Sequence, residues 1–151
     1  MDYLLDTDIC IYILRNKPAE VLKRFIQLKP EQLFISSISV SELYYGVENS
    51  QNHKQNTLAL KKFLQTPTIV DFNEAAAIEA ARIRHQLKTR GTPIGAYDVQ
   101  IAAIAIARHF TLITNNTREF KRIRNLKVLH LKVVRKLLRR RRKKLHHAYR
   151  V

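Results

Sequence analysis

Several residue types are scarce in this chain. Its 151 residues include one cysteine, three glycines and no tryptophan. The single cysteine, Cys10, cannot form an internal disulfide, which is typical of proteins that fold in a reducing compartment. The scarcity of glycine, together with 46% hydrophobic residues, argues against a fibrous or disordered chain. We therefore expect a globular fold with enough length for a real hydrophobic core.

Long apolar runs are missing as well. The longest unbroken run, Ile101 to Ala107, is far too short to cross a bilayer. The N-terminus reads MDYLLDTD, which places acids where a secretory signal needs positive charge. These features predict a soluble, cytoplasmic protein that has no membrane partner.

Acidic residues are absent from the last part of the chain. Residues 1–120 carry 14 Lys+Arg and all 12 Asp+Glu, whereas residues 121–151 carry the other 14 basic residues and no acid. The formal net charge of +16 therefore describes mainly the C-terminal part. A basic tail attracts any polyanion, so this charge does not distinguish RNA from DNA or from an acidic membrane.

Short apolar runs alternate with longer helical patterns along the chain. The predicted strands are Tyr3–Leu5, Leu33–Ile35, Thr68–Val70, Thr111–Ile113 and Val128–Leu131. The predicted helices span roughly residues 8–16, 18–28, 39–49, 54–65, 73–90 and 95–109. Repeated strand-then-helix order predicts a three-layer α/β/α fold, in which helices cover both faces of a central parallel sheet.

The ends of the long fifth helix have recognisable signals. Asn73 precedes an alanine-rich stretch and is predicted to be the N-cap. Gly91 and Pro93 follow the helical pattern, where a left-handed cap and a residue that cannot continue the helix belong. The next helix, Gly95 to His109, is apolar nearly all round and is predicted to be buried.

Four acids follow predicted strands or open the helices after them: Asp6, Glu42, Asp98 and Glu119. In an open parallel sheet, ligands bind beyond the carboxyl ends of the strands, so we expect these carboxylates to lie together. For Asp98 there is an alternative, because an acid in the first turn of a helix also responds to the helix dipole. Asp71 follows a strand too, but we leave it outside the site as an ordinary acid that leads a helix.

A cluster of carboxylates favours a bound metal ion. Mg²⁺ and Mn²⁺ take oxygen ligands, and packed like charges are costly unless a cation neutralises them. A bound metal can activate a water, orient it toward a phosphate and stabilise the charge on the leaving oxygen. Phosphodiester hydrolysis needs these three things and requires no base from His or Cys.

Four segments of the chain also resemble one known family. LLDTDICIYIL, ISSISVSELYYGVENS, RGTPIGAYDVQIAAIA and TLITNNTREFKRI occur in this order over about residues 1–130. They resemble PIN-domain ribonucleases and, more narrowly, the VapC-type toxins of type II toxin–antitoxin modules. The resemblance implies a PIN-like fold and a site in which the acids matching Asp6, Glu42 and Asp98 bind Mg²⁺ or Mn²⁺. It also implies a cognate antitoxin that blocks the site, a homodimer, and a structured RNA such as initiator tRNA as target.

The fourth acid departs from the common pattern of the family. Many PIN domains carry Asp where this chain has Asn116, and the nearest acid is Glu119, as in the NNTREF version of VapC-like sequences. We expect Glu119 to reach the same metal or its water. The alternative is a surface acid that pairs with Arg118 or Lys121. The residues expected to form hydrogen bonds around the carboxylates are Thr7, Thr114, Asn115 and Asn116.

Other reactive or aromatic residues have simpler explanations. Asp8 is expected to N-cap the first helix, although it could instead add negative charge to the rim of the pocket. Cys10 lies among apolar residues and is expected in the core. The six histidines show no zinc-like spacing, and no glycine loop suits a nucleotide phosphate. Tyr44, Tyr45 and Tyr97 could stack on RNA bases, but such residues are more often part of a core or an interface.

The chain is predicted to have two parts, a PIN-like nuclease domain at residues 1–131 and a basic C-terminal tail at residues 132–151. Nine of the thirteen residues from 132 to 144 are basic, with apolar residues at helical spacing. This tail could be an amphipathic helix that grips RNA phosphates, or it could be disordered.

The predicted function is a metal-dependent endoribonuclease that acts on structured RNA such as tRNA. Two alternatives stay open. In the first, the acids are structural and the protein is a non-catalytic nucleic-acid-binding protein that uses its tail. In the second, the chain is a PIN-like DNase.

Overall fold

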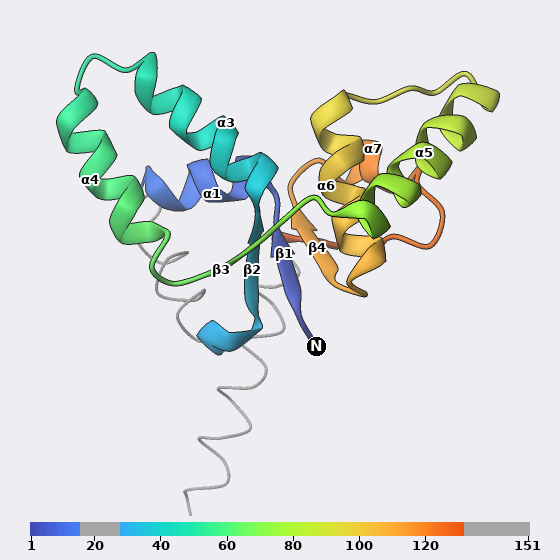
Figure 1. Ribbon diagram of the computed structural model, residues 1–151, viewed down its shortest axis with the longest axis horizontal. Helices are drawn as coiled ribbons and strands as arrows, with labels where there is room; N and C mark the ends of the chain where they lie inside the picture. Colours follow the sequence, from blue (N-terminus) through green and yellow to red (C-terminus); the bar gives the residue numbers. More distant parts are fainter. Residues whose placement is uncertain (16–27, 132–151) are drawn as a thin grey trace, which may run out of the picture.

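A five-stranded parallel sheet forms the centre of the molecule. The computed structural model describes residues 1–15 and 28–131. The strands are β1 (Tyr3–Leu5), β2 (Leu33–Ser36), β3 (Thr68–Val70), β4 (Thr111–Thr114) and β5 (Lys127–His130). Their order in the sheet is β3-β2-β1-β4-β5, and all four pairings are parallel. The N-terminal strand therefore lies in the middle of the sheet (Figure 1).

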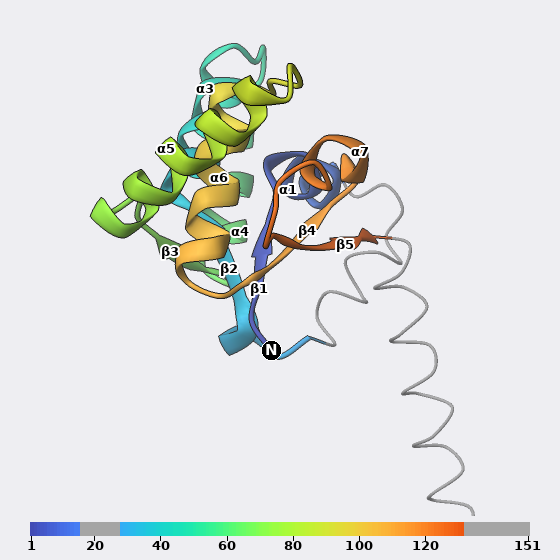
Figure 2. The same cartoon turned by 90° about the vertical axis from the view of Figure 1, so that its right-hand side faces the viewer.

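Helices cover the sheet on both faces. The helices are α1 (Thr7–Leu14), α3 (Ser37–Glu48), α4 (His53–Phe63), α5 (Glu74–Thr89), α6 (Ala96–Ala107) and α7 (Thr117–Phe120), and a 3₁₀ helix, η1 (Pro30–Gln32), precedes β2. Figure 1 shows α3 and α4 on one side of the molecule and α5 and α6 on the other. The helices α5 and α6 run side by side in both views (Figures 1 and 2).

The two faces of the sheet bury separate hydrophobic clusters. Successive side chains of a strand point to opposite faces, and β1 shows this directly. Leu4 packs in one cluster with residues of α5 and α6, such as Ile104. Leu5 packs in the other with residues of α1 and α3, such as Ile9 and Leu43. Burial on both faces explains the continuous apolar runs of the strands and confirms the predicted three-layer α/β/α fold.

The helix ends follow the predicted chemistry. The Asn73 side chain accepts a hydrogen bond from the Ala76 backbone N–H at 3.1 Å, as an N-cap does. Gly91 has a φ of 66°, and its N–H donates to the Lys88 carbonyl at 3.0 Å. A residue without a side chain fits this left-handed turn best. Both predictions for this helix are confirmed.

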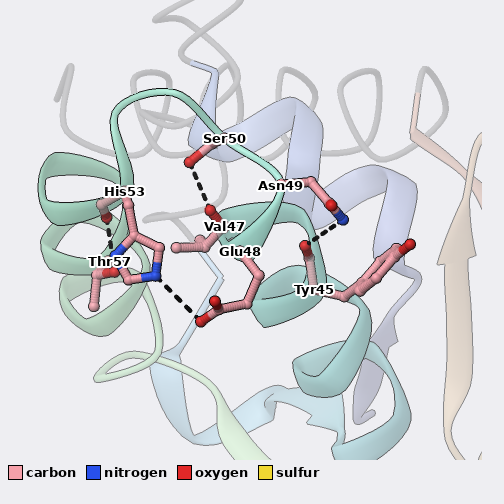
Figure 3. A network of polar contacts seen from close by, with 7 residues as sticks. All are labelled: Tyr45, Val47, Glu48, Asn49, Ser50, His53 and Thr57. Atoms are coloured by element: carbon pink, nitrogen blue, oxygen red, sulfur yellow. Dashed lines mark hydrogen bonds and ion pairs between the residues drawn. The ribbon is translucent and has the colours of Figure 1, made fainter.

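The turn between α3 and α4 is fixed by local polar contacts (Figure 3). The Ser50 hydroxyl donates to the Val47 carbonyl at 2.7 Å, and His53 Nε2 lies 3.1 Å from Glu48 Oε1. The side chains of His53 and Glu48 are exposed, so their contact contributes little to stability. Its structural effect is local: it ties the end of α3 to the start of α4.

The predicted elements agree closely with those observed. Each predicted strand is present within one residue at either end, and each predicted helix in the described range lies within two. Two short elements were not predicted, η1 and α7, because three or four residues are too few to show a period. The helix predicted at 18–28 and the tail at 132–151 fall largely or wholly outside the described residues.

The described residues also bear on the environment of Cys10 and on membrane-spanning helices. Cys10 is fully buried in the core, and burial raises the pKa of its thiol. It is therefore a core residue, as predicted, and not a nucleophile. No helix among the described residues is both long and apolar enough to span a membrane.

Candidate active site

The predicted site residues meet beyond the carboxyl ends of β1 and β4. Asp6 follows directly after β1, and Thr114 is the last residue of β4, the neighbouring strand. Glu42 lies on α3, which begins at the end of β2. Asp98 lies in the first turn of α6, and Glu119 lies on α7 just after β4. Parallel strands place these four segments at one edge of the sheet.

Asp6 is the most enclosed of the four acids. Only 4% of its surface is exposed. It is the N-cap of α1, where its Oδ1 accepts from the Thr7 backbone N–H at 2.8 Å. Its Oδ2 accepts from the hydroxyl of Thr114 at 2.7 Å. These two hydrogen bonds fix the orientation of the carboxylate.

Burial has a marked effect on the acidity of Asp6. The pKa of this carboxyl is raised from 3.8 to about 6, mainly by desolvation and also by the nearby charges of Asp98 and Asp8. The hydrogen bonds from Thr114 and Thr7 act in the opposite direction. Asp6 is thus a buried acid that faces other acids without a neutralising base among its hydrogen-bond partners.

The pKa of Asp98 is raised in the same way as that of Asp6. Its side chain is partly buried, and desolvation raises its pKa to about 6. The next contributions, in order, come from the charges of Glu119, Glu42 and Asp8. A purely dipolar role at the helix start would lower the pKa of this acid, since a helix N-terminus favours the charged form. The observed direction reflects burial first and the neighbouring carboxylates next.

A chain of hydroxyls holds Glu42. The Thr7 hydroxyl lies 2.7 Å from Glu42 Oε1 and 2.9 Å from Ser39 Oγ. A hydroxyl has one proton and a carboxylate only accepts, so Thr7 donates to Glu42 and accepts from Ser39. Ser36 Oγ in turn lies 3.0 Å from Ser39 Oγ and accepts from the Ser39 backbone N–H at 2.9 Å. The residue beside Asp6 therefore orients a second acid of the site.

Asn116 and Glu119 form a pair on the opposite wall. Asn116 Nδ2 donates to Glu119 Oε2 at 3.0 Å, and the Asn116 backbone N–H donates to the Thr114 hydroxyl at 2.9 Å. Glu119 is therefore not an isolated surface acid, since the Asn116 side chain donates to it and its charge raises the pKa of Asp98. Asn115 is exposed, and no hydrogen bond among the described residues ties it to the carboxylates.

The expected role of Asp8 is wrong. The N-cap of α1 is Asp6, because the helix begins at Thr7 and Asp8 already lies inside its first turn. Asp8 is exposed in the first turn, and its charge raises the pKa of both Asp6 and Asp98. The alternative role, negative charge at the rim of the pocket, agrees with this position. Asp71, which we left outside the site, follows the edge strand β3, two strands away from Asp6.

Two residues of the site were not predicted, Ser36 and Ser39. Both are fully buried, although serine is usually found at the surface. Ser36 caps α3 and takes part with Ser39 in the hydroxyl chain that reaches Glu42. The signal in the sequence was ISSIS at the junction of a strand and a helix, where a capping serine is expected.

The carboxylates fit a divalent cation by chemistry and by charge. Their donors are all oxygens, as Mg²⁺ and Mn²⁺ prefer. Their mutual repulsion is the kind of energy that a bound cation relieves. In residues 1–15 and 28–131, no three His, Cys, Asp or Glu side chains already surround a common point at ligand distances. Asp98, Glu42 and Glu119 are only partly buried, which leaves room for their side-chain torsions to adjust.

The cavity between α5 and α6 is separate from this cluster. Its volume is about 880 Å³, and its lining includes Phe72, Ala77, Leu87, Ile94 and Val99. Its charged lining residues are basic, and no carboxylate contributes to the lining, so the cavity lacks the acidic oxygen ligands that Mg²⁺ and Mn²⁺ prefer. The candidate active site is the carboxylate cluster, chosen for its chemistry rather than its volume.

Comparison with known proteins assigns the family. The family model described as PIN domain matches residues 3–126. The chain is 39% identical over 127 residues to the tRNA(fMet)-specific endonuclease VapC of Shigella flexneri, a match that covers 84% of this chain and 96% of that protein. It is 41% identical over 127 residues to ribonuclease VapC2 of Rickettsia felis, which covers 83% of this chain and 95% of that protein.

Solved structures give the same result. The crystal structure of VapBC2 from Rickettsia felis, bound to a DNA fragment from its promoter, contains a chain that matches with a TM-score of 0.82 and 38% identity. The match covers 86% of this chain and 98% of that one. DNA-bound VapBC from Salmonella typhimurium matches with a TM-score of 0.82 and 36% identity, over 87% and 98% of the two chains. The chain therefore belongs to the PIN-domain family and, within it, to the VapC ribonucleases.

Proposed function

We propose that this ribonuclease hydrolyses phosphodiester bonds in structured RNA at the carboxylate cluster and that it depends on Mg²⁺ or Mn²⁺. The observation that carries the proposal is the electrostatic coupling at Asp98. Acids from three other segments, Glu119, Glu42 and Asp8, all raise its pKa. Acids gathered in this way at the carboxyl edge of a parallel sheet are more readily explained by a metal site than by a structural role.

Each acid has a distinct role in this proposal. Asp6 and Asp98 are the main metal ligands, and Glu42 completes the ligand set. Glu119 acts as the fourth acid in place of the Asp that many PIN domains have at the position of Asn116. The metal, when bound, supplies the activated water and stabilises charge on the leaving oxygen.

The surrounding hydroxyls and amides position these acids. Thr114 holds one oxygen of Asp6, and Thr7 holds one oxygen of Glu42. Such partners of ligating carboxylates fix their direction and strengthen metal binding. Asn116 holds Glu119 in the same way from the opposite wall.

The relatives suggest the substrate and the partners. The proteins from Shigella flexneri and Salmonella typhimurium are named tRNA(fMet)-specific endonucleases, and we propose a tRNA as the substrate here. The two solved structures described above are VapBC complexes bound to DNA. We therefore propose a cognate antitoxin that blocks the site, a homodimer and action in the cytoplasm.

In our proposal the chain consists of a catalytic part and an RNA-binding tail. Residues 1–131 form the nuclease domain, and residues 132–151 form a basic tail that adds non-specific attraction to RNA. The tail is not part of the chemistry, because the four acids lie within the first part. Deletion after Leu131 is expected to weaken RNA binding and to flatten its salt dependence.

Cleavage assays separate this function from its alternatives. Purified protein with Mg²⁺ is incubated with tRNA and with single-stranded DNA, and the same reactions are repeated with EDTA. We expect cleavage of tRNA that EDTA abolishes. Preference for DNA would favour a PIN-like DNase. RNA binding without cleavage would favour the non-catalytic alternative.

A further inference from the structure

Two segments that are far apart in the sequence are basic and contain no acid. Residues 80–97 carry four Lys or Arg and no Asp or Glu, and residues 120–131 carry the same numbers. The first segment is the C-terminal part of α5 with the loop after it and the first two residues of α6. The second runs from the end of α7 through β5. Residues 1–120 are nearly balanced in charge, so the first segment is a local excess of positive charge. The second segment begins the last part of the chain, which contains no acid.

The side chain of Gln86 fastens the two segments together. Its Nε2 donates to the Arg122 carbonyl at 2.9 Å, and its Oε1 accepts from the Arg124 backbone N–H at 3.3 Å. A neutral amide can do both, whereas lysine cannot accept and a carboxylate would cancel charge. The link therefore joins two basic segments without reducing their charge.

The same segments also share a hydrophobic core. Ile83 and Leu87 on α5 pack in one cluster with Phe120 and Ile123. All four are buried. The basic side chains around them consequently sit on a rigid support rather than on a loose loop.

Exposed basic residues lie on both segments near the contact that Gln86 makes. Arg82 and Gln86 on α5 and Arg90, the C-cap of this helix, are four residues apart and lie on one face. Arg82, Arg90, Lys121 and Arg124 are exposed, and Arg122 is partly exposed. Arg82 pairs with Glu79, and none of the other four has an ion pair among the described residues. We call these five residues the basic band: Arg82, Arg90, Lys121, Arg122 and Arg124.

The band begins close to the active site. The Arg122 backbone N–H donates to the Glu119 carbonyl at 3.0 Å, so the band starts within one helical turn of the fourth acid. Four clustered carboxylates repel a polyanionic substrate, and nearby positive charge offsets that repulsion. Regularly spaced phosphates suit a surface of several unpaired Lys and Arg side chains.

We propose that the basic band binds backbone phosphates of the RNA substrate away from the bond that is cut. It acts as a substrate-positioning surface held by Gln86. The inference rests on the proposed ribonuclease function and adds the place where the substrate lies beyond the carboxylates. It predicts that band residues affect binding of RNA and its salt dependence, but not the chemical step.

A charge-matched comparison tests the band. The band variant is Arg90→Gln, Lys121→Gln, Arg124→Gln, and the control is Lys54→Gln, Lys61→Gln, Lys62→Gln on α4, whose three lysines are also exposed. Both lose three charges from the full chain, tail included. RNA binding is measured from 50 to 200 mM salt with tRNA, in proteins that also carry Asp98→Asn to prevent cleavage.

We expect the band variant to bind tRNA about 10-fold more weakly, with its salt dependence reduced by roughly two to three units of slope, because three phosphate contacts are lost. The control is expected to stay within about 2-fold of the parent. With Asp98 intact, the band variant should show a raised KM for tRNA and an unchanged kcat. A second variant, Gln86→Met, keeps the charge and removes both hydrogen bonds, and it should weaken RNA binding by about 3-fold while the protein stays folded.

Several results would overturn the proposal. Equal losses of affinity in the band variant and the control would show that only total charge matters. Unchanged RNA binding with lost binding of an acidic protein partner would assign the band to that partner. A fall in kcat at saturating tRNA would place these residues in the chemistry instead. Failure of the ribonuclease function itself would appear separately, as absence of tRNA cleavage by the unmodified protein.

Discussion

The hydroxyl of Thr114 donates a hydrogen bond of 2.7 Å to Oδ2 of Asp6, a residue 108 positions earlier in the chain. Both side chains are buried, and they lie at the ends of neighbouring parallel strands. The same hydroxyl accepts from the Asn116 backbone N–H. A single buried hydroxyl thus connects the first acid of the site to the wall that carries the fourth.

Replacing Thr114 by Val removes this hydrogen bond with little change in shape. The bond lowers the pKa of Asp6, so its loss should raise that pKa further and weaken metal binding at neutral pH. We expect about a 10-fold increase in the Mg²⁺ concentration needed for half-maximal cleavage. The measurement is a Mg²⁺ titration of tRNA cleavage. Thr111→Val, three residues earlier on β4, is the control, and an equal effect there would show a general packing defect.

Thr7 provides a second test, at Glu42. Thr7→Val removes the donor to Glu42 Oε1 and the acceptor for Ser39. Cleavage should fall about 10-fold or more because the acid loses its orientation. Thr7→Ser keeps the hydroxyl and should restore most of the activity. A Ser variant as defective as the Val variant would show that the hydroxyl alone does not maintain the site and would contradict the hydrogen-bond explanation.

The Asn116–Glu119 pair allows the fourth acid to be moved. Glu119→Gln alone should lower kcat by about 10-fold, since the site loses one charge. Adding Asn116→Asp returns an acid to the position that many PIN domains use. It also keeps a hydrogen bond between the two side chains, with the new amide at position 119 as donor and the new carboxylate at position 116 as acceptor. We expect the double variant to recover part of the lost rate, as measured by single-turnover cleavage. No recovery would indicate that Glu119 acts by its position rather than by its charge.

The raised pKa of Asp6 also predicts how stability changes with pH. Its pKa is about 6 in the folded protein and 3.8 ordinarily, so the folded state holds the proton more tightly. Below pH 3.8 the acid is protonated in both states and costs nothing. As pH rises from about 4 to 6, the folded state loses stability, and the full penalty is present above pH 6. Asp98 acts in the same direction.

Denaturation of the metal-free protein with and without Asp6→Asn isolates this effect. The variant should gain about 2 kcal/mol relative to the unmodified protein between pH 4 and pH 7. Mg²⁺ should stabilise the unmodified protein more at pH 7 than at pH 4.5, because binding requires the charged carboxylates. A difference between variant and parent that stays constant with pH would contradict the pKa of Asp6.

The sequence predicted the layout of the fold because its signals are local and strong. Alternating apolar strands and helices, the Asn73 cap and the Gly91 turn each follow from neighbouring residues. Asp8 was misjudged because two acids, at positions 6 and 8, suit the same cap. The helix begins at Thr7, which makes Asp6 the cap and places Asp8 in the first turn.

The site was harder to read where contacts join distant segments. Ser36 and Ser39 have no individual signal that separates a buried hydroxyl chain from an ordinary strand–helix junction. Their role appears only when Thr7 comes within 2.9 Å of Ser39 across 32 positions of sequence. The link between Gln86 and the segment at Arg122 and Arg124 was equally hidden. Long-range hydrogen bonds of this kind depend on the completed fold.

The most direct test of the whole account is cleavage of tRNA in Mg²⁺ by the unmodified protein and by Asp98→Asn, which keeps the shape of the side chain and removes its charge. The account predicts that the unmodified protein cleaves, that EDTA stops it, and that Asp98→Asn is slower by at least about 100-fold while still binding tRNA. Cleavage by Asp98→Asn at the rate of the unmodified protein, or cleavage that survives EDTA, would contradict a metal-dependent site built from these carboxylates.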